Sequence, residues 1–271
     1  AAGIDESHFL VPVKPQYQMS MFRLRLRCRT NPDGAAHPKM KENGPALLQF
    51  EEKKLGAPTD RQDPAARGIS AELIQPDWPA QVQVTGFPFF NRAIPMPDDL
   101  SRFLDAGEPP IAFTLGTSAV GAAGGFYEES VKAVAALGRR AVLLVGKNPE
   151  NRPRDPLPKT VIAVEAAPHD QLFPRACAVV HQGGVGTTGQ ALLAGRPTLV
   201  VPHAHDQPDN ACRVARTGGA RVVYPHRYKA ARVTAELRAL LEEPQYAERA
   251  TATARVVAAE RGPDAAAAAI A

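Results

Sequence analysis

A glycine-rich turn between two apolar runs constrains the fold of this chain more than any other feature. The stretch reads VVHQGGVGTTGQALLAGRPTLVVPHAHDQPDN and covers residues 179–210. It predicts a buried strand, a tight turn, a helix over residues 187–194 and a second buried strand over residues 198–201. Two parallel strands joined by a helix are the repeating unit of an α/β sheet.

The same alternation continues on both sides of this stretch. Short apolar runs predict strands at residues 111–115, 142–145, 161–164, 178–180, 198–201 and 221–223. Helices are predicted at residues 128–137, 187–194, 209–217, 234–241 and 246–260, with a short one at the alanine-rich end. Gly138, Gly195 and Gly218 stand where a helix C-cap glycine belongs. The expected fold is α/β, a doubly wound parallel sheet over residues 76–271, after an irregular segment at residues 1–75.

Charge and cysteine usage exclude several classes of protein. The net charge of +4 comes from interspersed Lys, Arg, Asp and Glu, which does not favour nucleic-acid binding. Cys28, Cys177 and Cys212 are widely spaced, form no disulfide framework and suit a reducing, cytoplasmic compartment. No signal peptide is recognisable, and the longest uncharged run, residues 111–127, is too short to span a bilayer.

The turn itself predicts an anion site. Residues 184–189 satisfy the pattern GxGxxG after a strand, and the backbone amides of Gly186, Thr187 and Thr188 are expected to be free at the helix start. His181 precedes the turn and can donate a ring N–H to a phosphate oxygen. Two alternatives remain. One is a dinucleotide site with Asp206 as the ribose-binding acid, although that fingerprint normally opens the fold. The other is a turn that needs glycine only for its backbone angles.

A polar cluster, HDQPDN, follows the next strand. Asp206 and Gln207 offer side-by-side donors and acceptors that suit vicinal sugar hydroxyls. The alternative is a capping role, and Asp209 is expected to cap a helix that begins at Pro208. His203 and His205 have no nearby carboxylate or thiolate set to complete a tetrahedral metal site, so no metal is expected.

Residues 179–223 together resemble the donor-binding signature of family 1 glycosyltransferases of the GT-B fold, especially the bacterial antibiotic, rhamnosyl and sterol glycosyltransferases. PPIAFTLGTSAV resembles the strand and loop that open the C-terminal domain of that family, AAPHDQLFPRACAVVHQGG its nucleobase loop, and QPDWPAQVQVTGFPFF its interdomain linker. The resemblance covers residues 75–262, and its joint spacing is far more specific than GxGxxG alone.

The resemblance implies a role for each matching residue. The donor diphosphate would be held by His181, Gly183, Gly184, Gly186 and Thr187, with Thr117 and Ser118 on the opposite loop. The base would lie on Ala167, Pro168 and His169, and the sugar on Asp206, Gln207 and Asn210. Two departures affect base and sugar preference: there is no Trp near residues 165–169, and Gly189 and Gln190 stand where the plant branch has a ribose-binding Glu.

The implied activity is the metal-independent, inverting transfer of a sugar from a UDP- or dTDP-sugar to a hydroxyl of a small hydrophobic acceptor. The donor is a substrate, and no cofactor is expected. In the family, the acceptor pocket and the catalytic histidine lie in a first domain, whose opening pattern residues 1–75 lack. The chain is therefore expected to be a fragment, to work with a partner that carries the acceptor half, or to be a non-catalytic nucleotide-sugar-binding subunit. An NAD(P)-dependent oxidoreductase is the third class that the glycine pattern allows.

Overall fold

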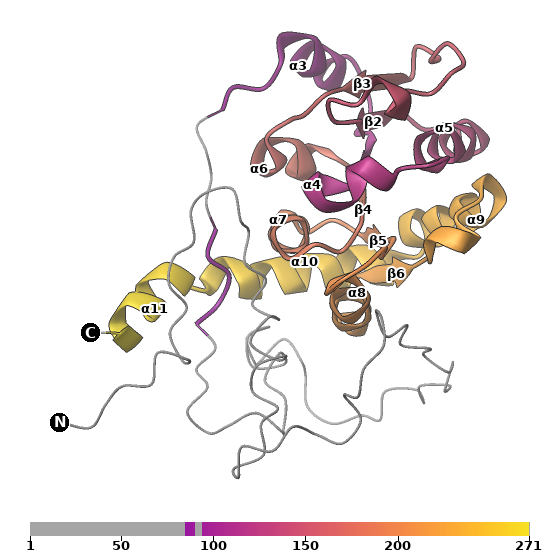
Figure 1. Cartoon of the computed structure of the whole chain (residues 1–271). Coiled ribbons are helices and arrows are strands. Elements are labelled where there is room, and N and C mark those ends of the chain that lie inside the picture. The colour runs from indigo at the N-terminus through magenta and orange to yellow at the C-terminus, as the bar shows by residue number, and fades with distance from the viewer. Residues whose placement is uncertain (1–84, 90–93, 271) are drawn as a thin grey trace, which may run out of the picture.

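The computed structural model describes residues 85–89 and 94–270, and the segment predicted to be irregular, residues 1–75, lies outside them. A six-stranded sheet forms the centre of the described part (Figure 1). Its strands are β1 (Ile111–Thr114), β2 (Ala141–Leu144), β3 (Val161–Val164), β4 (Ala178–His181), β5 (Thr198–Val200) and β6 (Ala220–Val222). They pair in the order β3-β2-β1-β4-β5-β6, and every pairing is parallel. This confirms the predicted α/β class, with each strand within one residue of its predicted position.

Helices cover both faces of the sheet, which is why its strands are almost continuously apolar. The α-helices are α3 (Asp98–Asp105), α4 (Gly116–Ala119), α5 (Phe126–Leu137), α6 (His169–Leu172), α7 (Val185–Ala194), α8 (Gln207–Arg216), α9 (Ala230–Glu242), α10 (Pro244–Ala259) and α11 (Gly262–Ile270). One face packs against α5 and α9. The other packs against α3, α6 and α7 in one cluster and α7, α8 and α10 in a second.

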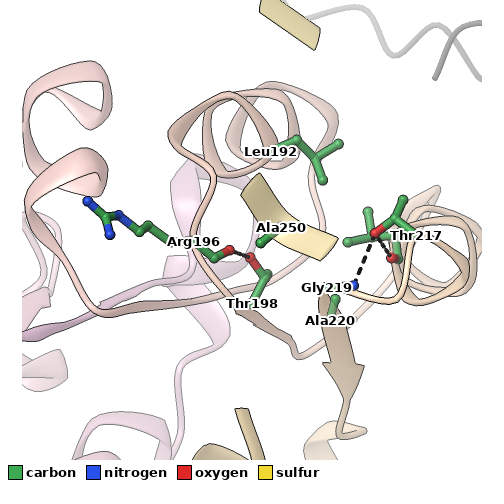
Figure 2. Close-up of a pocket in the computed structure, with 8 residues that line it drawn as sticks. Leu192, Arg196, Thr198, Thr217, Gly219, Ala220 and Ala250 are labelled. Carbon is green, nitrogen blue, oxygen red and sulfur yellow. Dashed lines mark hydrogen bonds between the residues drawn. The ribbon is translucent and has the colours of Figure 1, made fainter. Parts of the chain in front are cut away.

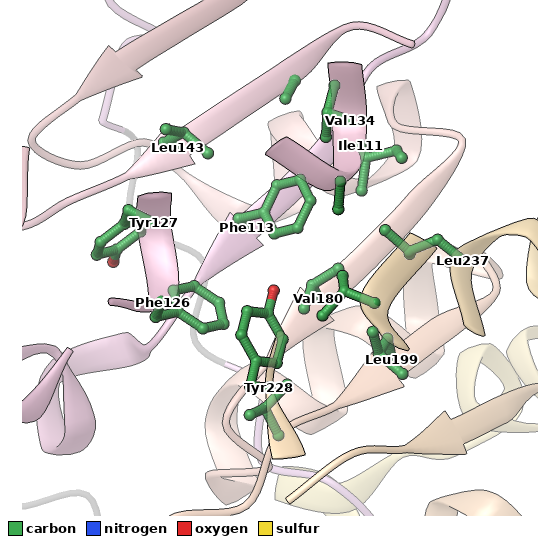
Figure 3. Close-up of a cluster of buried hydrophobic side chains, with 14 of the residues drawn as sticks. Ile111, Phe113, Phe126, Tyr127, Val134, Leu143, Val180, Leu199, Tyr228 and Leu237 are labelled. Carbon is green, nitrogen blue, oxygen red and sulfur yellow. The ribbon is translucent and has the colours of Figure 1, made fainter. Parts of the chain in front are cut away.

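Alternation along β1 shows how each strand serves both layers. Ile111 and Phe113 point into the α5–α9 layer, whereas Ala112 points into the opposite cluster. Figure 3 shows the first layer, in which Phe126 of α5 stacks on Tyr228 with ring centroids 4.7 Å apart. The Tyr228 hydroxyl also lies 2.8 Å from the Ser130 hydroxyl, so this buried ring keeps a hydrogen-bond partner.

Two of the predicted helix caps, Gly138 and Gly195, are confirmed, and the predicted N-cap Asp209 is not. Gly138 and Gly195 adopt the left-handed conformation, with φ of 62° and 65°, and cap α5 and α7 as predicted. Asp209 does not cap α8, so that prediction is wrong. The helix begins at Gln207, and Asp209 lies in its first turn, bonded to Arg213 Nε at 2.9 Å. Pro208 is the reason, because its fixed φ and missing N–H suit the first helical turn and allow an earlier start.

The strand order places a switch point between β1 and β4. From β1 the chain runs outward through β2 and β3, and from β4 it runs outward in the other direction through β5 and β6. The loops that leave the carboxyl ends of β1 and β4 therefore diverge and open a crevice, where ligands of such sheets bind. Across residues 85–89 and 94–270, no helix has both the length and the apolar character needed to cross a membrane.

Candidate functional site

Three loops meet at the carboxyl edge of the central strands. Thr114 of β1 is in register with His181 of β4, and His181 is in register with Val200 of β5, so these strand ends lie side by side. Gln207 Nε2 then donates to Ser118 Oγ at 3.2 Å, which joins the start of α8, after β5, to the short helix α4, after β1. The structure thus brings together predicted residues that are up to 89 positions apart in the sequence.

His181 is a neutral donor at the centre of this edge. Its ring is buried, and its Nδ1 accepts a hydrogen bond from the Gly183 amide at 2.9 Å. A neutral imidazole that accepts at Nδ1 carries its proton on Nε2. Burial lowers the pKa of His181 to about 3, with a smaller contribution from nearby His169, so the ring stays neutral at pH 7. Within the described part of the chain, Nε2 is a buried polar atom without a hydrogen-bond partner.

The start of α7 supplies further donors beside His181. Gly184 is the N-cap, and no side chain of the described residues caps the helix, so the first-turn amides of Val185, Gly186 and Thr187 point out of its end. The Thr188 amide, predicted to be free, instead donates to the Gly184 carbonyl at 2.9 Å. The reason is that α7 begins two residues before its predicted start, which makes this the first intrahelical bond. The Gly183 amide is likewise engaged, with His181.

The predicted sugar-binding residues form a network that shapes their own loop. Gln207 is buried, and its Oε1 accepts from the His203 and Ala204 amides at 2.8 and 3.2 Å. Asn210 donates to the Gly183 carbonyl at 2.7 Å and to Asp206 Oδ2 at 2.9 Å. Gln207 therefore fixes the loop after β5, and Asn210 ties the first turn of α8 to the glycine turn and holds the half-buried Asp206 carboxylate.

The predicted base-binding residues lie at the start of α6. Pro168 is the N-cap of that helix, and the half-buried His169 ring stacks on Phe173 with centroids 4.4 Å apart and planes 13° from parallel. Burial lowers the pKa of His169 to about 4. Helix α6, which begins at His169, contacts α7, which follows the glycine turn, so the base loop borders that turn.

Sequence reasoning missed Gln182, which is 3% exposed and follows His181 directly. A large polar side chain at the end of an apolar strand, between a histidine and two glycines, was the signal that could have singled it out.

A separate small cavity lies at the amino-terminal ends of the strands, opposite the carboxyl ends that carry His181 (Figure 2). It is lined in part by Thr198 and Ala220, the first residues of β5 and β6, and by Ala250 of α10. It is therefore at the amino ends of the strands, away from His181. Among the described residues, no group of three or more His, Cys, Asp or Glu side chains could hold a metal ion.

Comparisons with known proteins agree with this geometry. The family model described as "Erythromycin biosynthesis protein CIII-like, C-terminal domain" matches residues 129–270. The chain is 37% identical over 213 residues to the O-mycaminosyltylonolide 6-deoxyallosyltransferase of Streptomyces fradiae, which covers 78% of this chain and 49% of that protein. It is 39% identical over 124 residues to the vancomycin aglycone glucosyltransferase of Amycolatopsis orientalis, covering 46% of this chain and 30% of that protein. The chain thus spans about half the length of the first relative and less of the second.

Solved structures show the same architecture. The glycosyltransferase VinC in complex with DTDP superposes with a TM-score of 0.59 and 26% identity, over 71% of this chain and 48% of that one. The glycotransferase of kitacinnamycin superposes with a TM-score of 0.55 and 30% identity, over 61% of this chain and 42% of that one. With the family model, the fold and these relatives in agreement, this chain belongs to the erythromycin biosynthesis protein CIII-like C-terminal domain family of GT-B glycosyltransferases.

Proposed function

We propose that this chain binds a nucleoside-diphosphate sugar in the crevice between β1 and β4 and forms the donor half of a glycosyltransferase. The observation that carries the proposal is the His181 Nε2–H group, a buried, neutral donor beside the start of α7 that has no hydrogen-bond partner among the described residues. Buried donors in folded proteins normally have partners, and the N-terminus of a helix favours an anion. A diphosphate oxygen meets both requirements. The DTDP complex of VinC supports this ligand class.

The roles follow from the placement of the residues. In this proposal the diphosphate is bound by His181 and by the amides of Gly184, Gly186 and Thr187, with Thr117 and Ser118 facing it from the loop after β1. Ala167, Pro168 and His169 contact the base, uracil or thymine. Asp206 and Gln207 bind sugar hydroxyls, and Asn210 orients Asp206. Because the Gln207 amide is bonded to Ser118 at 3.2 Å, sugar binding exchanges that bond for one to the sugar.

The chemistry proposed is inverting transfer. The hydroxyl oxygen of a small hydrophobic acceptor attacks the anomeric carbon, and the bond from that carbon to the diphosphate oxygen breaks with its electron pair on the diphosphate. His181 and the α7 amides stabilise the charge that develops there, in the place where other enzymes use a metal ion. A base outside the described residues removes the acceptor proton. We further propose that residues 76–271 are the donor domain and that the acceptor side comes from residues beyond it or from a partner protein.

Calorimetric titration of the chain with dTDP, UDP and NAD tests the donor site. We expect at least one nucleoside diphosphate to bind and NAD not to bind. His181→Ala should weaken diphosphate binding about tenfold or more, since a hydrogen bond to a charged group is worth about 1.5–3 kcal/mol. The matched control is His226→Ala, because His226 is exposed and lies beyond the edge strand β6. It should bind like the wild type.

Binding of NAD alone would replace this proposal with the oxidoreductase alternative, and binding of none of the three would reject the site. A second assay, release or transfer of sugar from dTDP- and UDP-glucose, separates a transferase from a binding subunit. Turnover by the chain alone supports the transferase. Binding without turnover supports the partner-dependent subunit.

A further inference from the structure

Gln182 lies between the two turns that flank the crevice. One turn follows β1 and contains Gly116, and the other joins β4 to α7 and contains Gly184. A Cβ atom added to Gly184 would lie 2.7 Å from Gln182 Nε2, and one added to Gly116 would collide with the same atom. A single side-chain amide thus packs against the backbone of both turns.

The backbone of Gly184 does not itself require glycine. Its φ of −64° and ψ of 141° are accessible to any residue. Gly183 differs, because its φ of 86° lies in the left-handed region that favours glycine. Glycine is therefore needed at position 184 because a side chain there would overlap with the side chain of Gln182.

Packing against glycine backbone on both sides holds this side chain in place. Gln182 is 3% exposed, and its Oε1 is a buried atom without a hydrogen-bond partner in the described part of the chain. Its neighbours on both sides are glycines that have no side chain to move aside. The amide therefore acts as a spacer whose size fixes how closely the two turns approach.

We propose that Gln182 is a positioning residue that sets the separation between the Gly116 and Gly184 turns, and hence the width of the diphosphate crevice. This inference rests on the proposed donor site. It assigns Gln182 no contact with the reacting atoms. Its effect reaches the ligand through the Gly184 amide and the first turn of α7 on one side, and through Thr117 and Ser118 on the other.

A double-mutant cycle of Gln182→Ala and Gly184→Ala tests the spacer. Each variant is titrated with dTDP, or with UDP if that is the ligand the wild type prefers, and is unfolded with urea without ligand. Either single substitution should weaken binding about tenfold, the first by letting the turns close and the second by forcing them apart. In the double variant the added methyl group fills space that Gln182 has vacated. Its affinity should be within about threefold of Gln182→Ala, not a further tenfold weaker.

The conservative variant separates shape from polarity. Gln182→Met has nearly the same length and volume but no amide, so it should bind within about threefold of the wild type. If it binds as weakly as Gln182→Ala, the amide group matters and the spacer inference is wrong. The inference is also overturned if Gly184→Ala costs the same affinity with and without Gln182, since the ligand itself would then need the space.

Ligand-free unfolding keeps this test distinct from that of the proposed function. Gly184→Ala should lower the urea midpoint in the wild-type background and leave it nearly unchanged in the Gln182→Ala background. If the wild type binds no nucleoside diphosphate yet this coupling is present, the donor-site proposal fails while the spacer contact is confirmed. Equal midpoint shifts in both backgrounds overturn the contact.

Discussion

At the scale of single residues, the site depends on keeping histidines neutral. His181 and His169 have pKa values of about 3 and about 4, in both cases mainly because burial disfavours the charged ring. A neutral His181 can accept from the Gly183 amide at Nδ1 and still donate from Nε2, whereas a protonated ring could not accept that bond. The glycine turn therefore depends on the protonation state of the histidine it follows.

This neutrality predicts a pH dependence of stability. Both folded pKa values lie below the ordinary value of 6.5, so the unfolded chain binds more protons than the folded chain between pH 6.5 and about 4. The free energy of unfolding should be fully retained above pH 6.5 and should fall as the pH drops through that window. Each histidine contributes a slope of up to about 1.4 kcal/mol per pH unit. Urea unfolding at pH 8, 7, 6 and 5 measures it.

Substitutions assign the slope to its residues. His181→Gln should flatten the decline between pH 6 and pH 5 by up to about 1.4 kcal/mol, whatever its effect on stability at pH 8. The same change at the exposed His226 should leave the slope at its wild-type value. An unchanged slope in His181→Gln would show that His181 is not buried in neutral form.

At the scale of elements, α7 is the helix whose position matters most, because its first turn forms one wall of the crevice. Its C-terminal end is held at Gly195, where an added Cβ would lie 3.0 Å from Ala254 Cβ in α10. The C-cap of α5, Gly138, has nearly the same backbone angles, and no atom in residues 85–89 or 94–270 lies within 4 Å of an added Cβ. The two glycines thus share a conformation and differ only in packing.

Alanine at each position separates these two contributions. Gly138→Ala should cost about 1–2 kcal/mol of folding free energy, from left-handed strain alone. Gly195→Ala should cost at least about 1 kcal/mol more, because the methyl group also overpacks the contact between α7 and α10. Urea unfolding of both variants measures the difference. Equal losses would mean that α10 moves aside freely and does not fix α7.

At the scale of the whole molecule, the segment before the sheet belongs to the packed domain. Phe87 is 7% exposed and lies in the cluster of α7, α8 and α10. Its amide donates to Glu260 Oε2 at 3.1 Å, and an added Cβ on Gly189 would lie 2.9 Å from its ring. The stretch that resembles an interdomain linker therefore contributes core contacts to the described domain.

Two truncations test the proposed boundary at residue 76. A chain that begins at residue 76 should keep the urea midpoint of the full chain and its dTDP affinity. A chain that begins at residue 95 loses Phe87 and should be less stable by about 3 kcal/mol, the usual cost of removing a buried Phe side chain. Phe87→Ala in the full chain is the control and should show a similar loss. If the chain that begins at residue 76 fails to fold, the domain boundary lies nearer the N-terminus.

The sequence alone predicted the strands, the helices α5 and α7 to α11, and the capping role of two glycines, but not α3, α4 or α6. The runs at residues 111–115 and 178–180 were predicted as buried strands because both faces of a parallel sheet are covered. Gly138 and Gly195 were predicted as caps because left-handed backbone favours glycine. The position of His181 before a strand-to-helix turn was enough to predict an anion site, because the amides at a helix start are a local property.

Which groups are free to bind a ligand depends on the tertiary structure. Asp209 and Thr188 were predicted incorrectly because helix starts depend on a residue or two of local geometry, and each shift changes which amide or carboxylate is engaged. The link from Gln207 to Ser118 spans 89 residues, and no local pattern encodes it. The position of Gln182 between a histidine and two glycines could have singled it out, but no local pattern shows what its side chain contacts. Its neighbours are the backbones of two turns, one after β1 and one after β4, and only the pairing of β1 with β4 brings them to the same side chain.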